Sequence, residues 1–577
     1  MGRSWTRTLA ALHLLALLSA TPLSGAEERD GFGQDQTIHV LRMRRDASAP
    51  SKISCELSPW SQWSSCQPCQ DNKYRSRSVI QFGQFGGRPC TDFLYEGQPC
   101  PALDTCQANT PCDNGFSCTN GRCIHERLAC NDDDDCGDYS DEDECVAIRP
   151  TCRGYLQPLS LTEAIGSGVN VLGREVRARP LDNERYNGRC ETVMDGTARR
   201  RVRLAWNIPT FIFQTQAQQL VSTEVYETSS EMVKKLYLEL TRDLRAGSTS
   251  GAYGKAMVEA GIEAIWSYNT SETHEYIRVK GQMELARFKL RSSGLELSGD
   301  FIRDLKGLPI EYDKGAYFKI LEDYGTHYAS SGTLGGKYQM VYVLNKSEMR
   351  KARITAEHLK GCLSKGTNSR SKIAGEPKKT NPEVCDLTGA QQETSSRVPS
   401  VIQDVVALVI GGDVEYLTKL KAMLSAGKKP IDGSVYSEWV DSLVRSPALI
   451  RPTLQPISAL VPLTLPHSPR VRGNLDRALG EYVAEYDVCK CQLCRNGGTT
   501  TLLHGRCLCL CPPLFQGDAC QTPKNSQARP GYTDGAWGCW GTWSVCQGGQ
   551  QRRQRQCHGQ QGGGATCLGE NTGSMYC

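Results

Sequence analysis

A run of acidic residues between Cys130 and Cys145 offers the clearest metal-binding chemistry in the sequence. Asp135, Asp141 and Glu142 lie there among further aspartates and glutamates. Carboxylates this close together repel one another in a small fold unless a cation neutralises them. Carboxylate and carbonyl oxygens are hard ligands, which favours calcium over zinc. The sequence therefore predicts a calcium site, with a solvated acidic loop as the alternative.

The six cysteines of residues 110–147, with Ser140-Asp141-Glu142 before the last of them, resemble the low-density-lipoprotein receptor class A repeat. The resemblance implies one structural calcium ion. Asn131 stands where the repeat usually has an aspartate, and it can still offer an oxygen with one charge fewer. The implied ligands are the carboxylates of Asp135, Asp141 and Glu142, the carbonyls of Leu128 and Asp133, and the side chain of Asn131.

Tryptophans three residues apart, followed by closely spaced arginines, occur near both ends of the chain. Guanidinium groups stack on indole faces by cation–π attraction, so the pattern predicts layered side chains. Residues 54–108 and 536–577 thereby resemble thrombospondin type-1 repeats, with generic disulfide knots as the alternative. The spacing also resembles a C-mannosylation signal. The implied acceptors are Trp60, Trp63, Trp537 and Trp540, and the arginines are Arg75, Arg77, Arg552, Arg553 and Arg555.

A histidine in the long middle of the chain raises the question of catalysis. His327 could act as a general base, but neither a GxSxG nucleophile motif nor an HExxH motif accompanies it. We therefore expect no enzyme activity. We expect His327 to order a junction between sheet and helix by hydrogen bonding, and the glycines after it to let backbones approach closely.

The residues around this histidine match a signature of the membrane-attack-complex/perforin family. They are Tyr324, Gly325, Thr326, His327 and Tyr328, followed six residues later by Gly335 and Gly336. Residues 150–488 are identified on this basis as a domain of that family. The resemblance implies an α+β domain, a bent antiparallel sheet with flanking helical clusters, between small disulfide-rich modules. In the family these clusters convert into two hairpins that line a pore.

Further segments of this domain resemble terminal complement members of the family; they are residues 168–173, 181–190, 308–312 and 405–412. The resemblance implies a secreted protein that polymerises on complement-marked target membranes and forms the β-barrel pore of the membrane attack complex. The implied partners are the assembling terminal complement complex, further copies of this chain and the lipid bilayer of the target cell. The alternative is a non-lytic member that docks into such an assembly or serves as an extracellular adhesion scaffold.

Residues 251–268 alternate apolar with polar or small side chains, as a strand with one lipid-facing side would. Val258, Ile262 and Trp266 lie on the apolar side, but Val258, Ile262 and Ile265 are also spaced as on a helix. A segment that fits both states suits a helix-to-strand switch, and a permanent amphipathic helix is the alternative. The return strand is expected to carry Ile277, Val279, Met283 and Leu285 on its apolar side.

The second hairpin that the family implies would lie between Cys362 and Cys385, which we expect to form a disulfide. This stretch is basic, contains two prolines and shows no apolar alternation. A lipid-facing Lys or Arg near mid-bilayer costs about 2–4 kcal/mol, so the stretch is a poor spanning strand. Asn269 and Asn345 begin N-glycosylation sequons. A glycan at a leading tip would be costly to move across the bilayer, so Asn269 is unglycosylated, or it is not the leading tip, or insertion follows assembly of an open, water-filled arc. The family's behaviour favours the last of these.

The composition indicates how these sites are held. The chain has 577 residues and 28 cysteines, a content that excludes a reducing cytosol. The cysteines gather toward the two ends, while the middle is long enough to build a hydrophobic core. The formal charge of +4 gives no reason to expect a nucleic-acid partner. We expect two small modules, one large domain and two further small modules.

The N-terminus has the features of a secretory signal peptide over residues 1–26: basic residues, a short apolar run and small residues before the cleavage point. A leader follows over residues 27–53, in which Arg42-Met43-Arg44-Arg45 has the spacing of a basic processing site. No later apolar run approaches the ~20 residues that a membrane helix needs. The mature protein is expected to be secreted.

Residues 489–521 resemble an epidermal-growth-factor-like module, with a zinc site as the alternative reading of its close cysteines. A linker is expected over residues 522–535. Seven cysteines lie between Cys489 and Cys520, and five lie between Cys539 and Cys577. An epidermal-growth-factor-like fold pairs six of the first seven, which leaves Cys489 without a partner in its own module. Its expected partner is Cys539, upstream of the last tryptophan repeat.

Overall fold

The computed structural model describes the chain from residue 50 onward, within the compact unit of residues 49–577. Gaps in this description lie at residues 67–70, 102–111, 113–114, 155, 160, 171–176, 196–199, 228, 230–231, 234, 237–260, 263, 266–267, 269–272, 358, 361–400, 426–432, 512–514, 524–535, 542–543, 546, 549, 559–566, 568–569 and 577. The signal peptide and almost all of the expected leader therefore lie outside the described residues.

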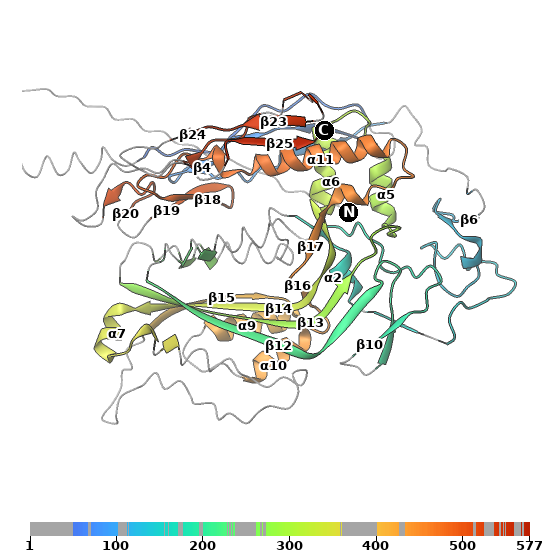
Figure 1. Cartoon of the computed structure of the whole chain (residues 1–577), viewed down its shortest axis with the longest axis horizontal. Helices are drawn as coiled ribbons and strands as arrows, with labels where there is room; N and C mark the ends of the chain where they lie inside the picture. The colour runs from blue at the N-terminus through green and yellow to red at the C-terminus, as the bar shows by residue number, and fades with distance from the viewer. Residues whose placement is uncertain are drawn as a thin grey trace, which may run out of the picture. The chain divides into compact units, whose positions relative to one another are not determined.

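A sheet of seven strands forms the centre of the large domain. Its four long strands are antiparallel neighbours and run side by side in Figure 1. They are, in spatial order, β12 (Thr210–Tyr226), β13 (His274–Lys289), β14 (His327–Asn345) and β15 (Ile402–Ile410). Three short strands pair with β14, namely β9 (Gly168–Val169), β16 (Ala448–Leu449) and β17 (Thr453–Pro456).

The sheet bends where its register shifts. The shift lies between Phe213 and Gln218 in the pairing of β12 with β13, and between Glu284 and Ala286 in the pairing of β13 with β14. Extra residues of this kind bend a strand and increase its twist. β13 and β14 curve in Figure 1. The bent antiparallel sheet expected from the sequence is therefore present.

One hydrophobic core lies around the signature end of β14. Helices α5 (Gly299–Lys306), α6 (Lys314–Tyr324) and α11 (Ser468–Glu485) contribute to it, with the short α2 (Thr162–Gly166) and the 3-10 turn η2 (Ile457–Leu460). The side chains of Ser298 and Asp313 cap the first two helices, so these helices begin at fixed residues. The buried members include Phe301, Tyr317, Phe318, Leu321, Leu475 and Tyr482.

A second core covers one face of the long strands. Alternate residues of β13, including Ile277, Val279 and Met283, are buried there against Trp439 of helix α10 (Gly433–Ser442) and against Leu443, which follows that helix. Helices α7 (Lys346–Ala352) and α9 (Val414–Ser425) contribute to the same cluster. None of the described helices is both long enough and apolar enough to span a bilayer.

The small modules are built from short strands and disulfides. The first module holds β1 (Glu56–Leu57), β2 (Asn72–Ser76), β3 (Val79–Gln81), β4 (Gly83–Gln84) and β5 (Tyr95–Pro99), and the second holds β6 (Phe116–Ser117), β7 (Cys123–Ile124) and η1 (Glu126–Leu128). A small sheet of β8 (Gln157–Pro158), β10 (Thr192–Asp195) and β11 (Arg200–Arg203) follows.

Two modules follow α11. The 3-10 turn η3 (Val488–Lys490) leads into the hairpin module, residues 489–523, which contains β18 (Thr499–Leu503), β19 (Arg506–Leu510), β20 (Phe515–Gln516) and β21 (Thr522–Pro523). The last module contains β22 (Ala536–Trp537), β23 (Gln550–Gln554), β24 (Cys557–His558) and β25 (Thr572–Tyr576). No described cysteine is free, as expected for a protein folded in an oxidising compartment.

Candidate functional site

The family signature forms the junction between α6 and β14. Gly325 has φ of 83°, and a Cβ there would lie 2.8 Å from the backbone nitrogen of Val169. The Thr326 backbone N–H and hydroxyl both donate to the Val169 carbonyl, at 3.1 and 3.0 Å. His327 lies beside Thr326, with Nδ1 3.0 Å from its Oγ1. Burial lowers the pKa of His327 to about 4, so the ring is neutral at pH 7.

The glycine pair of the signature allows two close approaches. A Cβ on Gly335 would lie 1.8 Å from the carbonyl oxygen of Met283, at the bend of the sheet. A Cβ on Gly336 would lie 2.6 Å from Leu443 and 2.8 Å from Trp439 of helix α10. Gly335 therefore allows the strands to approach at the bend, and Gly336 allows α10 to pack against the sheet.

Trp and Arg side chains are layered in the first module. The Arg75 guanidinium lies 4.9 Å from the ring centre of Trp60 and 4.6 Å from that of Trp63. Arg77 stacks on Trp60 at 4.3 Å. The layering expected from the tryptophan spacing is thus present there.

The last module repeats part of this arrangement. Arg553 and Arg555 both lie over the ring of Trp540, at 4.7 and 4.4 Å. The backbone of Trp537 belongs to β22, which pairs with β24.

The acidic loop of the second module places its predicted ligands close together. Asn131, Asp135 and Asp141 are buried. The Asn131 side-chain amide donates to Asp135 at 2.9 Å, and the Asp135 backbone N–H donates to Asp141 at 2.8 Å. Glu142 accepts from the backbone of Asn131 at 2.7 Å. Burial raises the pKa of the Asp135 carboxyl to about 6.

Oδ1 of Asp141 is buried and has no hydrogen-bond partner among the described residues. An orphaned carboxylate oxygen, beside a second buried carboxylate and an amide oxygen, fits a hard cation. The described residues hold no group of three acidic, histidine or cysteine side chains arranged for a metal, so carbonyl oxygens such as that of Leu128 would have to complete the set. The carboxylate of Asp133 is taken by Arg203, at 2.6 and 2.7 Å, which leaves its carbonyl for that role.

Between β12 and β13, described residues in the range 229–268 form helical turns, which we call the helical segment. Its Met232, Val233 and Leu236 cluster with Ile262 and Ile265, all nearly or fully buried. The same cluster includes Tyr276, Val341 and Val343 from one face of the central sheet. Ile262 is thus helical here, and Val258, Trp266 and Asn269 lie outside the described residues.

The expected return strand lies within β13. Ile277, Val279, Met283 and Leu285 belong to β13, which pairs with β12 on one side and β14 on the other. All four are buried against the α9 and α10 side of the sheet. In this structure their apolar side belongs to a protein core, and their insertion into lipid stays a prediction. The residues between Tyr226 and His274 connect β12 to β13.

The remaining predicted residues fall into two groups. Cys489 is joined to Cys539, with an S–S distance of 2.02 Å, as expected from the odd cysteine counts. Asn345 caps helix α7 by accepting from the backbone N–H groups of Ser347 and Glu348. Cys362, Cys385 and the polar stretch between them lie outside the described residues.

Sequence reasoning missed the contacts between modules. Lys314 of α6 and Lys490 of the hairpin module both pair with the buried Glu485, at 2.7 and 2.6 Å, and Glu485 also accepts from the backbone N–H of Val79 at 2.9 Å. The signal for this contact in the sequence is weak: a glutamate at the end of a helix, followed by a lysine five residues later.

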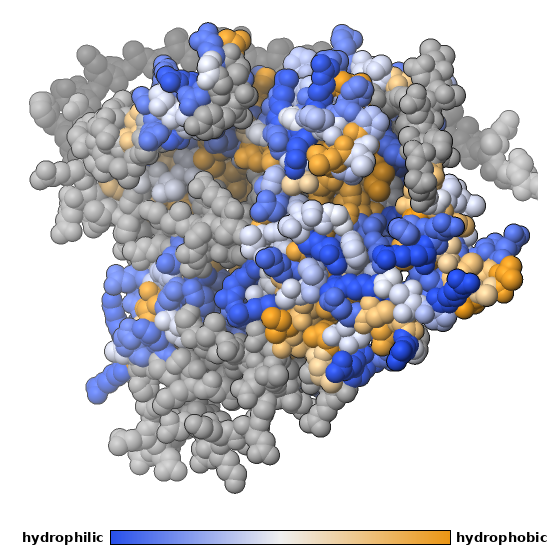
Figure 2. Space-filling view, turned by 45° about the vertical axis from the view of Figure 1, so that its right-hand side comes forward, coloured by the Kyte–Doolittle hydropathy of each residue, from blue (hydrophilic) through white to orange (hydrophobic). Residues whose placement is uncertain are grey.

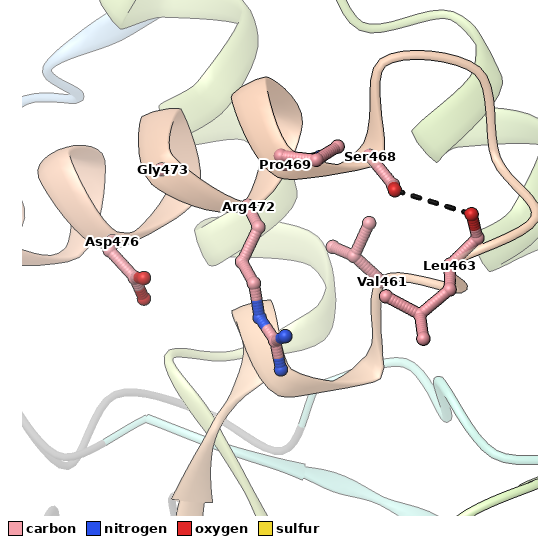
Figure 3. A pocket seen from close by; sticks show the side chains of 7 residues that line it. All are labelled: Val461, Leu463, Ser468, Pro469, Arg472, Gly473 and Asp476. Carbon is pink, nitrogen blue, oxygen red and sulfur yellow. Dashed lines mark hydrogen bonds between the residues drawn. The ribbon is translucent and has the colours of Figure 1, made fainter.

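A pocket of about 320 Å³ opens at the start of α11 (Figure 3). Val461 and Leu463 give it an apolar wall, and the Ser468 hydroxyl donates to the Leu463 carbonyl at 3.4 Å. Arg472 and Asp476 supply its charges. None of the residues predicted from the sequence lines this pocket.

Three family models match the chain. The MAC/Perforin domain matches residues 157–492, the low-density lipoprotein receptor domain class A residues 110–145, and the thrombospondin type 1 domain residues 58–106. A solved structure, GNIP1Aa from Chromobacterium piscinae, is 14% identical over 60% of this chain and 61% of its own, with a TM-score of 0.35.

Relatives of known name cover nearly the whole chain. Complement component C9 of Oncorhynchus mykiss is 34% identical over 91% of this chain and 97% of its own. The complement component C8 beta chain of Paralichthys olivaceus is 32% identical over 99% of both, and complement component C6 of Bos taurus is 31% identical over 91% of this chain and 57% of its own. The protein is therefore no enzyme: it belongs to the membrane-attack-complex/perforin family, among the terminal complement components.

Proposed function

We propose that this protein is secreted, polymerises on complement-marked membranes and contributes strands to the pore of the membrane attack complex. The observation that carries the proposal is the position of the helical segment. It connects β12 to β13, which are already antiparallel neighbours paired as far as Tyr226 and Tyr276. If the connecting residues extended, they would continue an existing hairpin and require no new topology.

The length of the connection supports this conversion. Residues 227–273 join the two strands, and a strand that spans a bilayer needs about 9–11 residues. Two such strands and a turn fit within the connection. Ile262 is fully buried in the soluble protein and would be covered by lipid after insertion, so its side chain is shielded from water in both states.

We propose a supporting role for calcium in the second module. Asp135, Asp141, Asn131 and Glu142, with the carbonyls of Leu128 and Asp133, would hold one ion. A bound ion would neutralise buried carboxylates and hold the module in shape. We also propose C-mannosylation of the tryptophan repeats and N-glycosylation of Asn269 and Asn345.

Within the terminal complement components, we propose the role of component nine, in a non-mammalian, fish-like form. The four segments quoted above resemble that protein, and the last module gives the chain a C-terminal thrombospondin-like repeat. A second candidate is a docking component that enters the assembly once. The C8 beta chain match over 99% of both chains favours it, as does the polar sequence between Cys362 and Cys385.

The decisive experiment counts the copies of this protein in each membrane lesion. Serum depleted of this protein is restored with fluorescently labelled protein, and lysis of antibody-coated erythrocytes is measured together with the bleaching steps per membrane lesion. Restored lysis with many copies per lesion supports polymerisation. Restored lysis with a single copy supports the docking role. Failure of the unlabelled protein to restore lysis would count against both.

A further inference from the structure

The two strands of the hairpin module carry different residues on their two faces. The pairs Thr499↔Leu510, Thr501↔Leu508 and Leu503↔Arg506 place Leu503, Leu508 and Leu510 on one face, because side chains of a strand alternate. We call this the leucine face. Cys507 and Cys509 lie on the opposite face and form disulfides with Cys491 and Cys494.

The leucine face is covered by the helical segment and the central sheet. Leu503 is 1% exposed and Leu510 3% exposed, and both belong to the same apolar cluster as Met232, Ile262 and Ile265. Leu508 packs against this cluster. The disulfides of Cys507 and Cys509 lie on the other face of the hairpin.

The hairpin is in turn fixed to the first module. β19 pairs in parallel with β4, with Arg506 opposite Gly83 and Cys507 opposite Gln84. The Gln84 side chain accepts from the Gln492 backbone N–H at 2.8 Å and donates to its carbonyl at 3.0 Å. The hairpin that carries the leucine face is therefore bonded to the first module.

We propose that the leucine face is a clamp that holds the helical segment on the sheet, and that separation of the two is a required step before the segment extends. The inference rests on the proposed function, since a segment that never converts needs no release. Ile262 and Ile265 cannot reach lipid while they remain clustered with Leu503 and Leu510. Separation exposes apolar side chains on both sides, so the clamp resists opening in water.

The test uses hydrogen exchange in the full-length soluble protein. Leu503→Ser removes apolar contact from the leucine face, and Leu510→Val is a milder second variant that suits a strand. Leu463→Ser is the matched control, because Leu463 is 85% exposed. We expect exchange in peptides covering residues 229–236 and 261–268 to accelerate at least ten-fold in Leu503→Ser and less in Leu510→Val, with no change in the control.

Exchange within residues 499–510 shows whether the hairpin itself stays folded in each variant. If a variant keeps the hairpin protected and leaves the helical segment at the unmodified rate, the clamp is overturned. A second measurement follows polymer formation on complement-coated cells. Faster exchange together with faster polymerisation supports the clamp, whereas faster exchange with unchanged polymerisation overturns its role as a required step. Absence of polymer from the unmodified protein counts against the proposed function instead.

Discussion

The hydroxyl of Tyr268 donates a hydrogen bond of 2.8 Å to the carboxylate of Asp404, 136 residues further along the chain. Tyr268 follows the helical residues Gly261, Ile262, Ala264 and Ile265, and Asp404 lies on the edge strand β15. Gly261 packs closely on the same strand, because a Cβ at this position would lie 2.7 Å from the Leu408 side chain. The helical segment is thus bonded to β15 as well as packed on the sheet.

Removal of this bond should loosen the segment. Tyr268→Phe deletes the donor and keeps the ring, so we expect a loss of about 1 kcal/mol of local stability. Hydrogen exchange of residues 261–265 measures it. Asp404→Asn supplies the second arm of a double-mutant cycle; if the two losses simply add, Tyr268 and Asp404 do not stabilise each other.

The buried ring of His327 predicts that the protein loses folding stability in acid. Its folded pKa of about 4 lies below the ordinary 6.5 because the ring is buried. Stability from the neutral ring is therefore complete above pH 6.5 and falls by about 1.4 kcal/mol per pH unit as pH drops toward 4. Melting temperatures of wild type and His327→Gln, compared from pH 7 to 4.5, should converge as the pH falls. Parallel curves would contradict the prediction.

The signature glycines can be tested against a glycine in open space. Gly335→Ala would place a Cβ against the Met283 carbonyl, so we expect loss of several kcal/mol or failure to fold. Gly473 of α11 has nothing within 4 Å of the corresponding position. Gly473→Ala should therefore stabilise by about 0.5–1 kcal/mol. Secretion yield and urea midpoint measure both; equal effects would show that the close approach is irrelevant.

Calcium should raise the stability of the second module. The side-chain amide of Asn131 donates to Asp135, so Asn131→Asp would set two buried carboxylates against each other. We expect the variant to bind calcium more tightly than wild type but to melt lower in EGTA. Titration calorimetry and melting of the full chain measure the two effects, with magnesium as the control ion. Identical melts in calcium and EGTA for both proteins would refute the site.

The bridge from Cys489 to Cys539 should retain the last module after the chain is cut. Limited proteolysis within residues 524–535 leaves the fragment covalently attached in the wild-type protein, and a non-reducing gel should show no release. The double variant Cys489→Ser/Cys539→Ser removes the bridge without creating a free thiol. We expect the fragment to separate from it on the same gel; a fragment that separates equally from wild type would exclude the bridge.

Local spacing allowed some of these features to be predicted from the sequence. The layering of Arg75 between Trp60 and Trp63 follows from the spacing of the tryptophans and arginines. Counting left Cys489 over, and the position of Cys539 ahead of the last tryptophan repeat made it the candidate partner. The signature located the central domain in the sequence, because two of its glycines, Gly325 and Gly335, lie where a Cβ would clash with the backbones of Val169 and Met283.

Other features depend on contacts that no local pattern encodes. The alternation of Ile277 and Val279 predicts a strand with an apolar side, but a protein core and a lipid bilayer cover such a side equally well. Ile262 fits a helix and a strand alike until Leu510 and Val341 are known to lie in its cluster. Exposed hydrophobic residues on the face in Figure 2 form several patches separated by hydrophilic ones.

The pairing of β4 with β19, together with the Cys489–Cys539 bridge, gives the chain a mechanical property. The first module is hydrogen-bonded to the hairpin module, and the hairpin module is covalently bonded to the last module. A pulling force applied between the first and last modules would pass along this ladder and this disulfide and would bypass β12 to β15. The first and last modules would therefore stay joined to each other through the hairpin module while strands β12 to β15 rearranged.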